Sequence, residues 1–208
     1  MLSRFYEPTT GSITVDGRDL QSFPVREWRK RLAAGFQDFA HLQLLARESI
    51  GVGDVEKIEH DDRILEALQR AAAGDLYPSL PSALDTQLGR YFEGGVDLSI
   101  GQWQKVALSR AMMRQRILLL LLDEPTASLD APTEHALFEH FASAARDYAA
   151  GSGAITLLVS HRFSTVRMAD LILVVANGRI VERGSHAELL RLNGLYAELY
   201  GLQARAYR

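Results

Sequence analysis

The feature that most constrains this chain is an unbroken apolar run at residues 117–122, which has Arg116 before it and Asp123 after it. The run is far shorter than the roughly 20 apolar residues that a membrane-spanning helix needs, and it has the length of a strand. A strand made only of apolar residues is typical of a parallel sheet that helices cover on both faces. We therefore expect residues 117–122 to form a core strand of an α/β protein.

Signals for strands and helices alternate along the rest of the chain. Further strands are predicted at residues 12–15, 32–36, 154–159 and 171–176, and the strand at 154–159 is expected to be buried like the apolar run. Helices are predicted at residues 25–31 and 61–73, after Asp130, after Ser185, and at residues 195–206. Asp16-Gly17 and Asn177-Gly178 are dipeptides that favour tight hairpin turns. The alternation predicts an α/β fold, and the helical character of residues 41–116 predicts a helical insert within it.

The overall charge of the chain gives no sign of a polyanionic partner. Lysine and arginine total 23 against 26 aspartate and glutamate residues, which gives a formal net charge of -3. This balance argues against a nucleic-acid partner and against an anionic membrane surface. The sequence has no cysteine, so it can form neither a disulfide nor a thiolate metal site. The first residues lack a charged region followed by an apolar stretch, and we expect no signal peptide.

Polar side chains follow several predicted strands, at the edge where ligands of open α/β sheets bind. Asp123 and Glu124 come directly after the apolar run, while Gln37 and His161 follow two other predicted strands. Two adjacent carboxylates are costly to desolvate, so a bound cation or a proton-transfer role would explain their position. Any one of these residues could be an ordinary solvated loop residue. A functional site is favoured because all four are expected at the same edge of the sheet.

A second candidate site lies where residues 98–102 lead into a predicted helix. The backbone N–H groups at a helix start can hold an anion such as a phosphate. Ser99 and Gln102 are also spaced as a capping box, a purely structural motif that stabilises a helix start. The spacing by itself therefore leaves open whether this segment binds a ligand or only begins the helix.

Taken together, these segments resemble the nucleotide-binding domain of an ABC transporter. The resemblance rests on LSIGQWQKVALSRAMMR at residues 98–114, followed closely by ILLLLLDEPTASLD at residues 117–130. Residues 36–39 are similar to the Q-loop of that family, and the order of the motifs matches as well. The segments most similar to exporter-type domains, which usually follow a membrane domain on the same polypeptide, are RFYEPTTGSITVDG, EGGVDLSIGQWQK and NGRIVERGSHAELL.

The resemblance implies a P-loop NTPase (RecA-like) core with an inserted α-helical subdomain. It divides the chain into a partial core with the Q-loop at residues 1–40, a helical subdomain ending in the signature helix at 41–116, and a core segment with Walker B, D-loop and H-loop at 117–208. It also implies two such domains that sandwich two ATP molecules. Both would be attached to the transmembrane domain of an exporter, at the cytoplasmic face of the cell membrane.

The site residues that the resemblance implies work in cis and in trans. In cis, Glu124 would orient or deprotonate the attacking water, and His161 would contact the γ-phosphate. Asp123 would hold Mg²⁺, and Gln37 would sense the metal and the γ-phosphate.

In trans, the signature would present hydroxyl, backbone N–H and amide groups to the γ-phosphate bound by the partner domain. These signature residues are Ser99, Gly101 and Gln102. Asp130, in the D-loop, would couple the two sites.

The sequence departs from the family pattern at two points. Ile100 stands where the signature usually has a glycine. More severely, no G-x-x-x-x-G-K-[ST] phosphate loop occurs anywhere in the chain, so its main grip on ATP is absent. Residues 2–6 resemble the last turn of the helix that this loop opens, which places the missing lysine within about ten residues before Met1. We therefore expect an N-terminally truncated domain that by itself binds ATP poorly and shows no ATPase activity.

The leading hypothesis is the ATP-hydrolysing domain of an ABC exporter that couples ATP hydrolysis to transport. The main alternative is a non-hydrolytic module that offers only its signature face to a partner, although Glu124 and His161 would then serve no purpose. A DNA-repair ATPase with the same signature would carry a long coiled-coil insertion, and only a short helical insert separates residues 37 and 98. A hydrolase built on Ser160, His161 and Asp170 is disfavoured, because neighbouring residues of a strand point to opposite faces.

Overall fold

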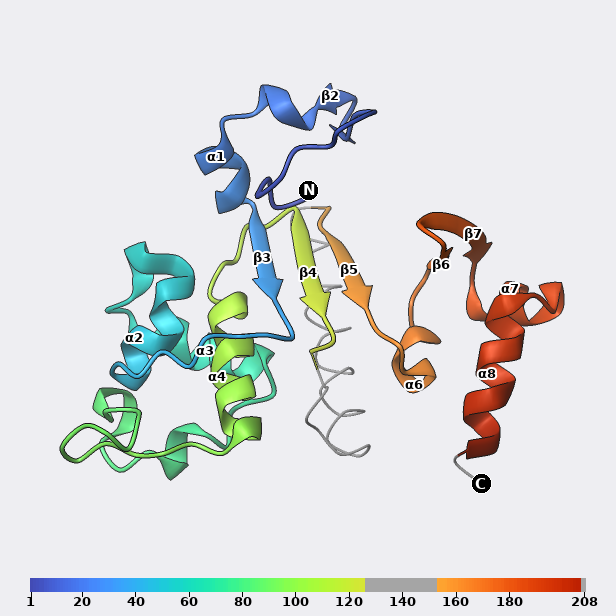
Figure 1. Cartoon of the computed structure of the whole chain (residues 1–208). Coiled ribbons are helices and arrows are strands. Elements are labelled where there is room, and N and C mark those ends of the chain that lie inside the picture. Colours follow the sequence, from blue (N-terminus) through green and yellow to red (C-terminus); the bar gives the residue numbers. More distant parts are fainter. Residues whose placement is uncertain (126–152, 207–208) are drawn as a thin grey trace. The chain divides into compact units, whose positions relative to one another are not determined.

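The computed structural model describes residues 1–125 and 153–206, which fall into two compact units, Met1–Leu158 and Val159–Arg208. Helices and strands alternate in the described residues, and the largest sheet is parallel (Figure 1), so the predicted α/β class is confirmed. No helix in these residues is long and apolar enough to cross a membrane. The helix predicted after Asp130 lies outside the described residues.

The central sheet of the first unit has the strand order β3-β4-β5, with β3 at Leu32–Gly35, β4 at Leu119–Asp123 and β5 at Ile155–Val159. β3 and β4 pair in parallel, with Gly35 opposite Leu122. Figure 1 shows β5 running in the same direction on the other side of β4. The apolar run thus forms the middle strand of the three, as its lack of polar residues predicts.

Two details of these strands differ from the prediction. β4 begins two residues later, because the N–H groups of Leu118 and Leu119 both donate to the carbonyl of Arg31, at 2.7 and 3.3 Å, before regular pairing starts. Leu120 and Leu122 are buried and the alternate residues of β4 are half-buried, since the main core of the unit lies against the first two. β5 is half-buried or exposed along its length, so the expected burial of both strands on both faces is wrong for the described residues.

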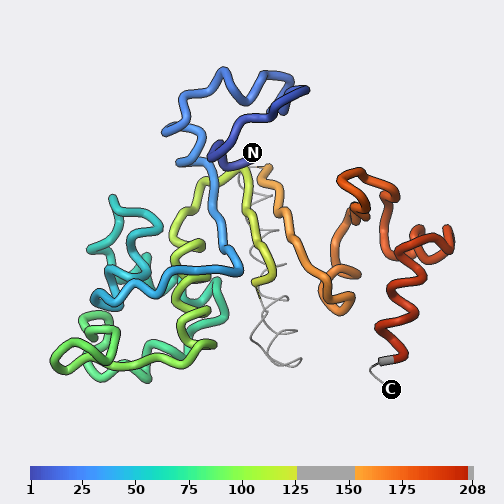
Figure 2. The backbone as a smooth tube through the Cα atoms, in the orientation of Figure 1, coloured from blue at the N-terminus to red at the C-terminus, as the bar shows by residue number. Residues whose placement is uncertain are grey.

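Between β3 and β4 the chain forms the helical insert that the sequence predicts, and Figure 2 shows it returning through α4 to β4. Ile64 and Leu68 of one helix and Val106 and Met112 of another belong to its continuous core. Ala72 adopts a left-handed conformation with φ of 49°, which ends α3 before the predicted residue 73. The helices are α2 at Ala46–Gly51, α3 at Asp61–Arg70, α4 at Ile100–Met112, and 3₁₀-helices at Val52–Lys57, Tyr77–Ser79 and Ala83–Asp85.

The N-terminal residues form a hairpin followed by a short helix. The turn of the hairpin has positive φ at Asp16 (49°) and Gly17 (76°), as an Asp-Gly hairpin requires. The predicted first strand and first helix are therefore confirmed, with boundaries shifted by one or two residues. Their bounds are Thr14–Val15 for β1, Arg18–Asp19 for β2, Leu20–Ser22 for a 3₁₀-helix and Val25–Lys30 for α1.

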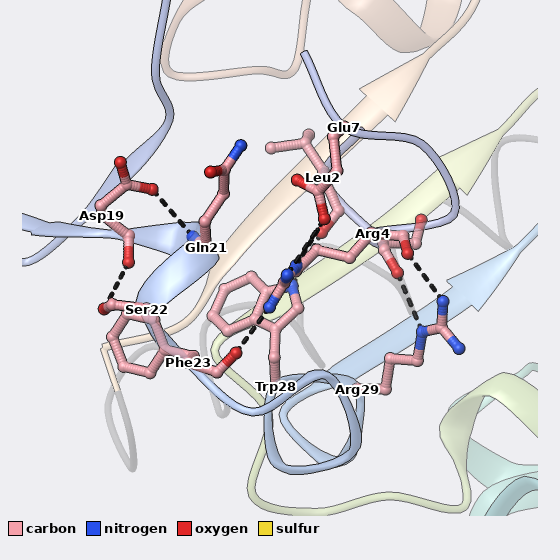
Figure 3. A network of polar contacts seen from close by, with 10 residues as sticks. Leu2, Arg4, Glu7, Asp19, Gln21, Ser22, Phe23, Trp28 and Arg29 are labelled. Carbon is pink, nitrogen blue, oxygen red and sulfur yellow. Dashed lines mark hydrogen bonds and ion pairs between the residues drawn. The ribbon is translucent and has the colours of Figure 1, made fainter.

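Figure 3 shows how α1 holds the segment at the start of the chain. The indole Nε1 of Trp28 donates to the carbonyl of Leu2 at 2.8 Å. The guanidinium of Arg29 donates to the carbonyls of Ser3 and Arg4 at 3.1 and 2.7 Å. Arg4 itself has a left-handed φ of 52°. Residues 2–6, whose sequence resembles the last turn of a helix, form a turn in the structure. Side chains of α1 cap the carbonyls of this turn, as often happens at the C-terminal end of a helix.

The second unit is built on the antiparallel hairpin of β6 and β7. Asn177 and Gly178 have φ angles of 51° and 72°, so the predicted Asn-Gly turn is confirmed. The carboxylate of Glu182 accepts the N–H groups of Leu195 and Tyr196 at 2.5 and 3.1 Å, which fastens the hairpin to the start of α8. The bounds in this unit are Phe163–Val166 for α6, Ile172–Ala176 for β6, Arg179–Gly184 for β7, His186–Leu192 for α7 and Leu195–Ala206 for α8.

Candidate functional site

Gln37 and Asp123 follow the carboxyl ends of two neighbouring strands. Because Gly35 pairs with Leu122 in the parallel ladder of β3 and β4, the residues that follow these two positions leave the sheet at the same edge. Asp123 is the last residue of β4 and is half-buried, while Gln37 is exposed. The structure therefore brings these two residues to one edge of the sheet, as the sequence predicts for the pair.

Glu124 lies in a turn with unusual backbone geometry. Its φ is 44°, in the left-handed region that residues other than glycine seldom adopt. The next residue is Pro125, which is buried, and a residue before proline is already restricted by the proline ring. Such strain costs about 1–3 kcal/mol and persists only where the surrounding structure holds the backbone in place. The predicted catalytic carboxylate thus stands on a constrained turn, a feature that the sequence did not indicate.

The turn after β4 contacts Gln104, a residue that no motif of the sequence indicates. Gln104 in α4 is 4% exposed, and its Nε2 donates to the carbonyl oxygen of Pro125 at 2.5 Å. Gln104 and Leu108 are one helical turn apart and both are buried, so Gln104 lies on the face of α4 that packs into the core. A glutamine on the apolar face of a helix is the signal that could have identified it.

The capping box predicted at the start of α4 is confirmed. The N–H of Ser99 donates to Oε1 of Gln102 at 2.9 Å, and the N–H of Gln102 donates to the hydroxyl of Ser99 at 3.3 Å. Ser99 is exposed, Gly101 and Gln102 are half-buried, and Ile100 is 64% exposed. The three signature residues therefore lie together at the open end of a helix of 13 residues, where an anion could accept further N–H groups. Their role in phosphate binding stays a prediction.

A stack of rings connects the segment after β3 to α4. The ring of Phe39 lies 5.4 Å from that of His41, and His41 stacks on Trp103 with 4.7 Å between centroids and 4° between planes. Arg110 adds a polar contact from the same helix, because its guanidinium donates to the carbonyl of Ala40 at 3.4 Å. Burial lowers the pKa of Arg110 from its ordinary value. The segment after β3 and α4 are thus in direct contact.

His161 lies in the second unit, so its expected place beside Asp123 stays a prediction. It is exposed, and its carbonyl accepts a hydrogen bond from Nε2 of Gln203 at 3.3 Å. Oε1 of the same glutamine accepts the N–H of Phe163 at 3.0 Å, so α8 holds the backbone on both sides of residue 162. Asp130 lies outside the described residues, and its D-loop role also stays a prediction.

The donor set at the edge of the sheet suits Mg²⁺. Asp123 offers carboxylate oxygens and Gln37 an amide oxygen, which are hard ligands of the kind that this cation prefers. In the described part of the chain, no three or more histidine, aspartate or glutamate side chains gather into a metal-binding cluster. Mg²⁺ is usually bound by one or two carboxylates together with substrate phosphates. The two residues therefore fit a cation that is shared with a nucleotide.

Comparison with known proteins places the chain among ABC transporter proteins. The family model described as ABC transporter matches residues 1–127. The chain is 35% identical over 200 residues to the nisin transport ATP-binding protein NisT of Lactococcus lactis subsp. lactis, and the match covers 96% of this chain and 32% of the relative. It is 39% identical over 202 residues to the ATP-dependent lipid A-core flippase of Pseudomonas fluorescens, with 97% of this chain and 32% of the relative covered.

A solved structure has the same fold. It is the structure of a bacterial Atm1-family ABC exporter with ATP bound, which matches with a TM-score of 0.83 and 35% sequence identity, over 98% of this chain and 33% of that one. This similarity confirms the predicted fold class, including the helical insert. The chain spans about a third of the length of these relatives.

Proposed function

The chain belongs to the ABC transporter family, and we propose that it is the ATP-hydrolysing part of an exporter that couples ATP hydrolysis to transport across a membrane. The observation that carries the proposal is the shared edge of β3 and β4, where Gln37 and the acidic pair Asp123-Glu124 follow adjacent strands. The similarity to an exporter solved with ATP bound supports ATP as the nucleotide.

Four residues of the chain would act in cis. Glu124 would orient the attacking water and take up its proton, as a general base does in phosphoryl transfer. Asp123 and Gln37 would hold Mg²⁺ at the edge of the sheet, and His161 would contact the γ-phosphate. When bound, Mg²⁺ neutralises negative charge on the phosphates. These roles are supported by the position of the carboxylates, because ligands of open α/β sheets bind just beyond the carboxyl ends of the strands.

The start of α4 would act in trans, on the γ-phosphate bound by a second nucleotide-binding domain. Ser99 would offer its hydroxyl, Gly101 its backbone N–H and Gln102 its amide. Preorganised donors of this kind stabilise the charge that develops during phosphoryl transfer. The exposure of Ser99 supports this role, because a partner chain can reach that end of the helix. Asp130 would couple the two sites of the resulting dimer.

The other partner would be the transmembrane domain of the exporter, which would keep this part at the cytoplasmic face of the cell membrane. The names of the relatives, a transport protein and a flippase, support a membrane partner. The net charge of -3 speaks against a nucleic-acid partner. Because the sequence contains no G-x-x-x-x-G-K-[ST], the phosphate loop would come from outside these 208 residues, which alone would not hydrolyse ATP.

The test is ATP turnover by the complete gene product, with and without the substitution Glu124→Gln. We expect Mg²⁺-dependent turnover that this substitution lowers at least about 100-fold, the effect of losing a general base. Glu56→Gln is the matched control, because it makes the same change of charge at an exposed residue of the helical insert. It should leave turnover unaltered.

Two outcomes would contradict the proposal at different points. Turnover by the 208 residues alone that Glu124→Gln abolishes would show that no external phosphate loop is needed. A complete gene product that binds ATP without any Glu124-dependent turnover would favour the non-hydrolytic partner module instead.

A further inference from the structure

Gln104 is a buried polar side chain that reaches the turn carrying Glu124. Glutamine is mostly a surface residue, yet Gln104 is 4% exposed. Its Nε2 donates to the carbonyl oxygen of Pro125, 21 residues further along the chain, at 2.5 Å. Its Oε1 is buried as well and accepts no hydrogen bond from the residues that the structure describes. The reverse orientation of the amide would press Oε1 against the carbonyl oxygen of Pro125, so only the donating orientation fits.

Packing alone does not account for a glutamine at this position. Apart from Ser109, the other buried residues of α4 are apolar, among them Val106, Leu108 and Met112. Methionine has nearly the length of glutamine and would fill the same space without burying an unmatched acceptor. The polar side chain at position 104 is therefore explained by its contact with Pro125.

The contact acts on a turn that has to be held. Glu124 combines a φ of 44° with a following proline, which is a rare backbone state. Pro125 has no N–H, so its carbonyl is the backbone hydrogen-bonding group through which this residue can be anchored. By binding that carbonyl, Gln104 restrains the peptide chain directly after Glu124, and with it the direction in which the carboxylate is presented.

We propose that Gln104 is a positioning residue for the Glu124 carboxylate, an inference that rests on the function proposed above. Gln104 lies about 6 Å along the helix axis from Ile100, the first residue of α4. The same rigid helix thus carries the end offered to a partner's phosphate and the anchor of the chain's own catalytic turn.

The test replaces Gln104 with methionine, which keeps the length of the side chain and removes the donor. The complete gene product is used for two measurements. One is the Kd for ATP, and the other is the rate constant for hydrolysis of bound ATP in a single turnover. This rate constant does not depend on the fraction of protein that folds, so it separates positioning from loss of structure. We expect Gln104→Met to lower the rate constant at least about tenfold, because small misplacements of a catalytic group are costly, while the Kd stays within about twofold.

Ser109→Ala is the matched control within the same helix. Ser109 is also fully buried, and its hydroxyl donates to the carbonyl of Lys105 at 2.8 Å, away from the turn. Its loss should leave the rate constant unaltered. The inference is overturned if Gln104→Met hydrolyses bound ATP at the unaltered rate, or if Ser109→Ala slows hydrolysis equally. If Glu124→Gln turns over as fast as the unsubstituted protein, the proposed function itself has failed.

Discussion

Two helices of this chain, α4 and α7, begin with the same capping box, and they can be compared atom by atom. The backbone nitrogen of Ser99 lies 2.9 Å from the side-chain oxygen of Gln102, and that of Ser185 lies 2.8 Å from the oxygen of Glu188. The return hydrogen bonds to the two serine hydroxyls measure 3.3 and 3.4 Å. The hydrogen bonds that start these two helices are therefore nearly identical in length.

The charge of the third helical residue separates the two helices. Glu188 brings a carboxylate to the positive end of α7, and hydrogen bonds from the backbone N–H and the hydroxyl of Ser185 lower the pKa of that carboxyl. Gln102 is neutral, so the positive end of α4 stays available to an anion from outside. The same local motif thus places a negative charge at the start of α7 and none at the start of α4, and a single functional group, carboxylate or amide, makes the difference.

The largest expected effect comes from giving α4 the charge of α7. Gln102→Glu keeps the capping box and places a carboxylate where the γ-phosphate would bind, so repulsion should lower ATP turnover at least about 100-fold. The free energy of unfolding should change by less than about 0.5 kcal/mol, because glutamate caps a helix as glutamine does. Steady-state turnover and urea unfolding of the complete gene product measure the two quantities.

The reverse change at the other helix is the control for this prediction. Glu188→Gln removes the charge from α7 and should leave ATP turnover unaltered. Equal losses of turnover in both variants would mean that the two helix starts do not differ in function, and the comparison would fail.

The capping serines test the same comparison with a smaller effect. Ser99→Ala and Ser185→Ala each remove an N-cap hydroxyl and should lower the free energy of unfolding by about 1 kcal/mol. Only Ser99→Ala should also slow ATP turnover, by about tenfold, because its hydroxyl is the one proposed to donate to a phosphate. Turnover that falls equally in both variants would trace the effect to helix stability instead.

The smallest effect is a pH dependence confined to α7. The pKa of Glu188 is lowered in the folded chain, so its ionised form stabilises the fold above the unfolded-state pKa of about 4.3. This stabilisation is lost as the pH falls through the lowered folded-state pKa. The difference in unfolding free energy between the unsubstituted protein and Glu188→Ala should therefore be constant near neutral pH and shrink below about pH 4.

Urea unfolding at several pH values checks this prediction. Gln102→Ala is the matched variant at the other helix, and its effect on stability should not follow the pH in this way, because an amide does not titrate. A stability difference for Glu188→Ala that is the same in acid and at neutral pH would contradict the lowered pKa.

Features that the sequence predicts well are those with local interactions. Each capping box depends on residues three positions apart, and the turn at Asn177-Gly178 depends on two residues that tolerate positive φ. The central place of β4 follows from the apolar composition of residues 117–122. Gln37 and Asp123 reach the same edge because each follows the end of a parallel strand.

Features that the sequence misses depend on contacts between distant segments. The first paired residue of β4 is decided by hydrogen bonds to the carbonyl of Arg31, and the exposure of β5 depends on what covers the sheet. Gln104 escapes prediction because its partner is the backbone carbonyl of Pro125, and a carbonyl has no signature in a sequence. The left-handed state of Glu124 is likewise invisible, since other glutamates before proline do not need to adopt it.

The sequence alone indicates most strands and the longer helices of the described residues, the caps and turns, and the acidic pair at the end of β4. Each of these is encoded by a few neighbouring residues, whose preferences are the same in any surroundings. Only the tertiary structure decided that α4 meets the turn after β4 through Gln104, and that Glu124 is held there in a strained conformation. That outcome depends on how a helix packs against a strand, and no short stretch of residues carries the information.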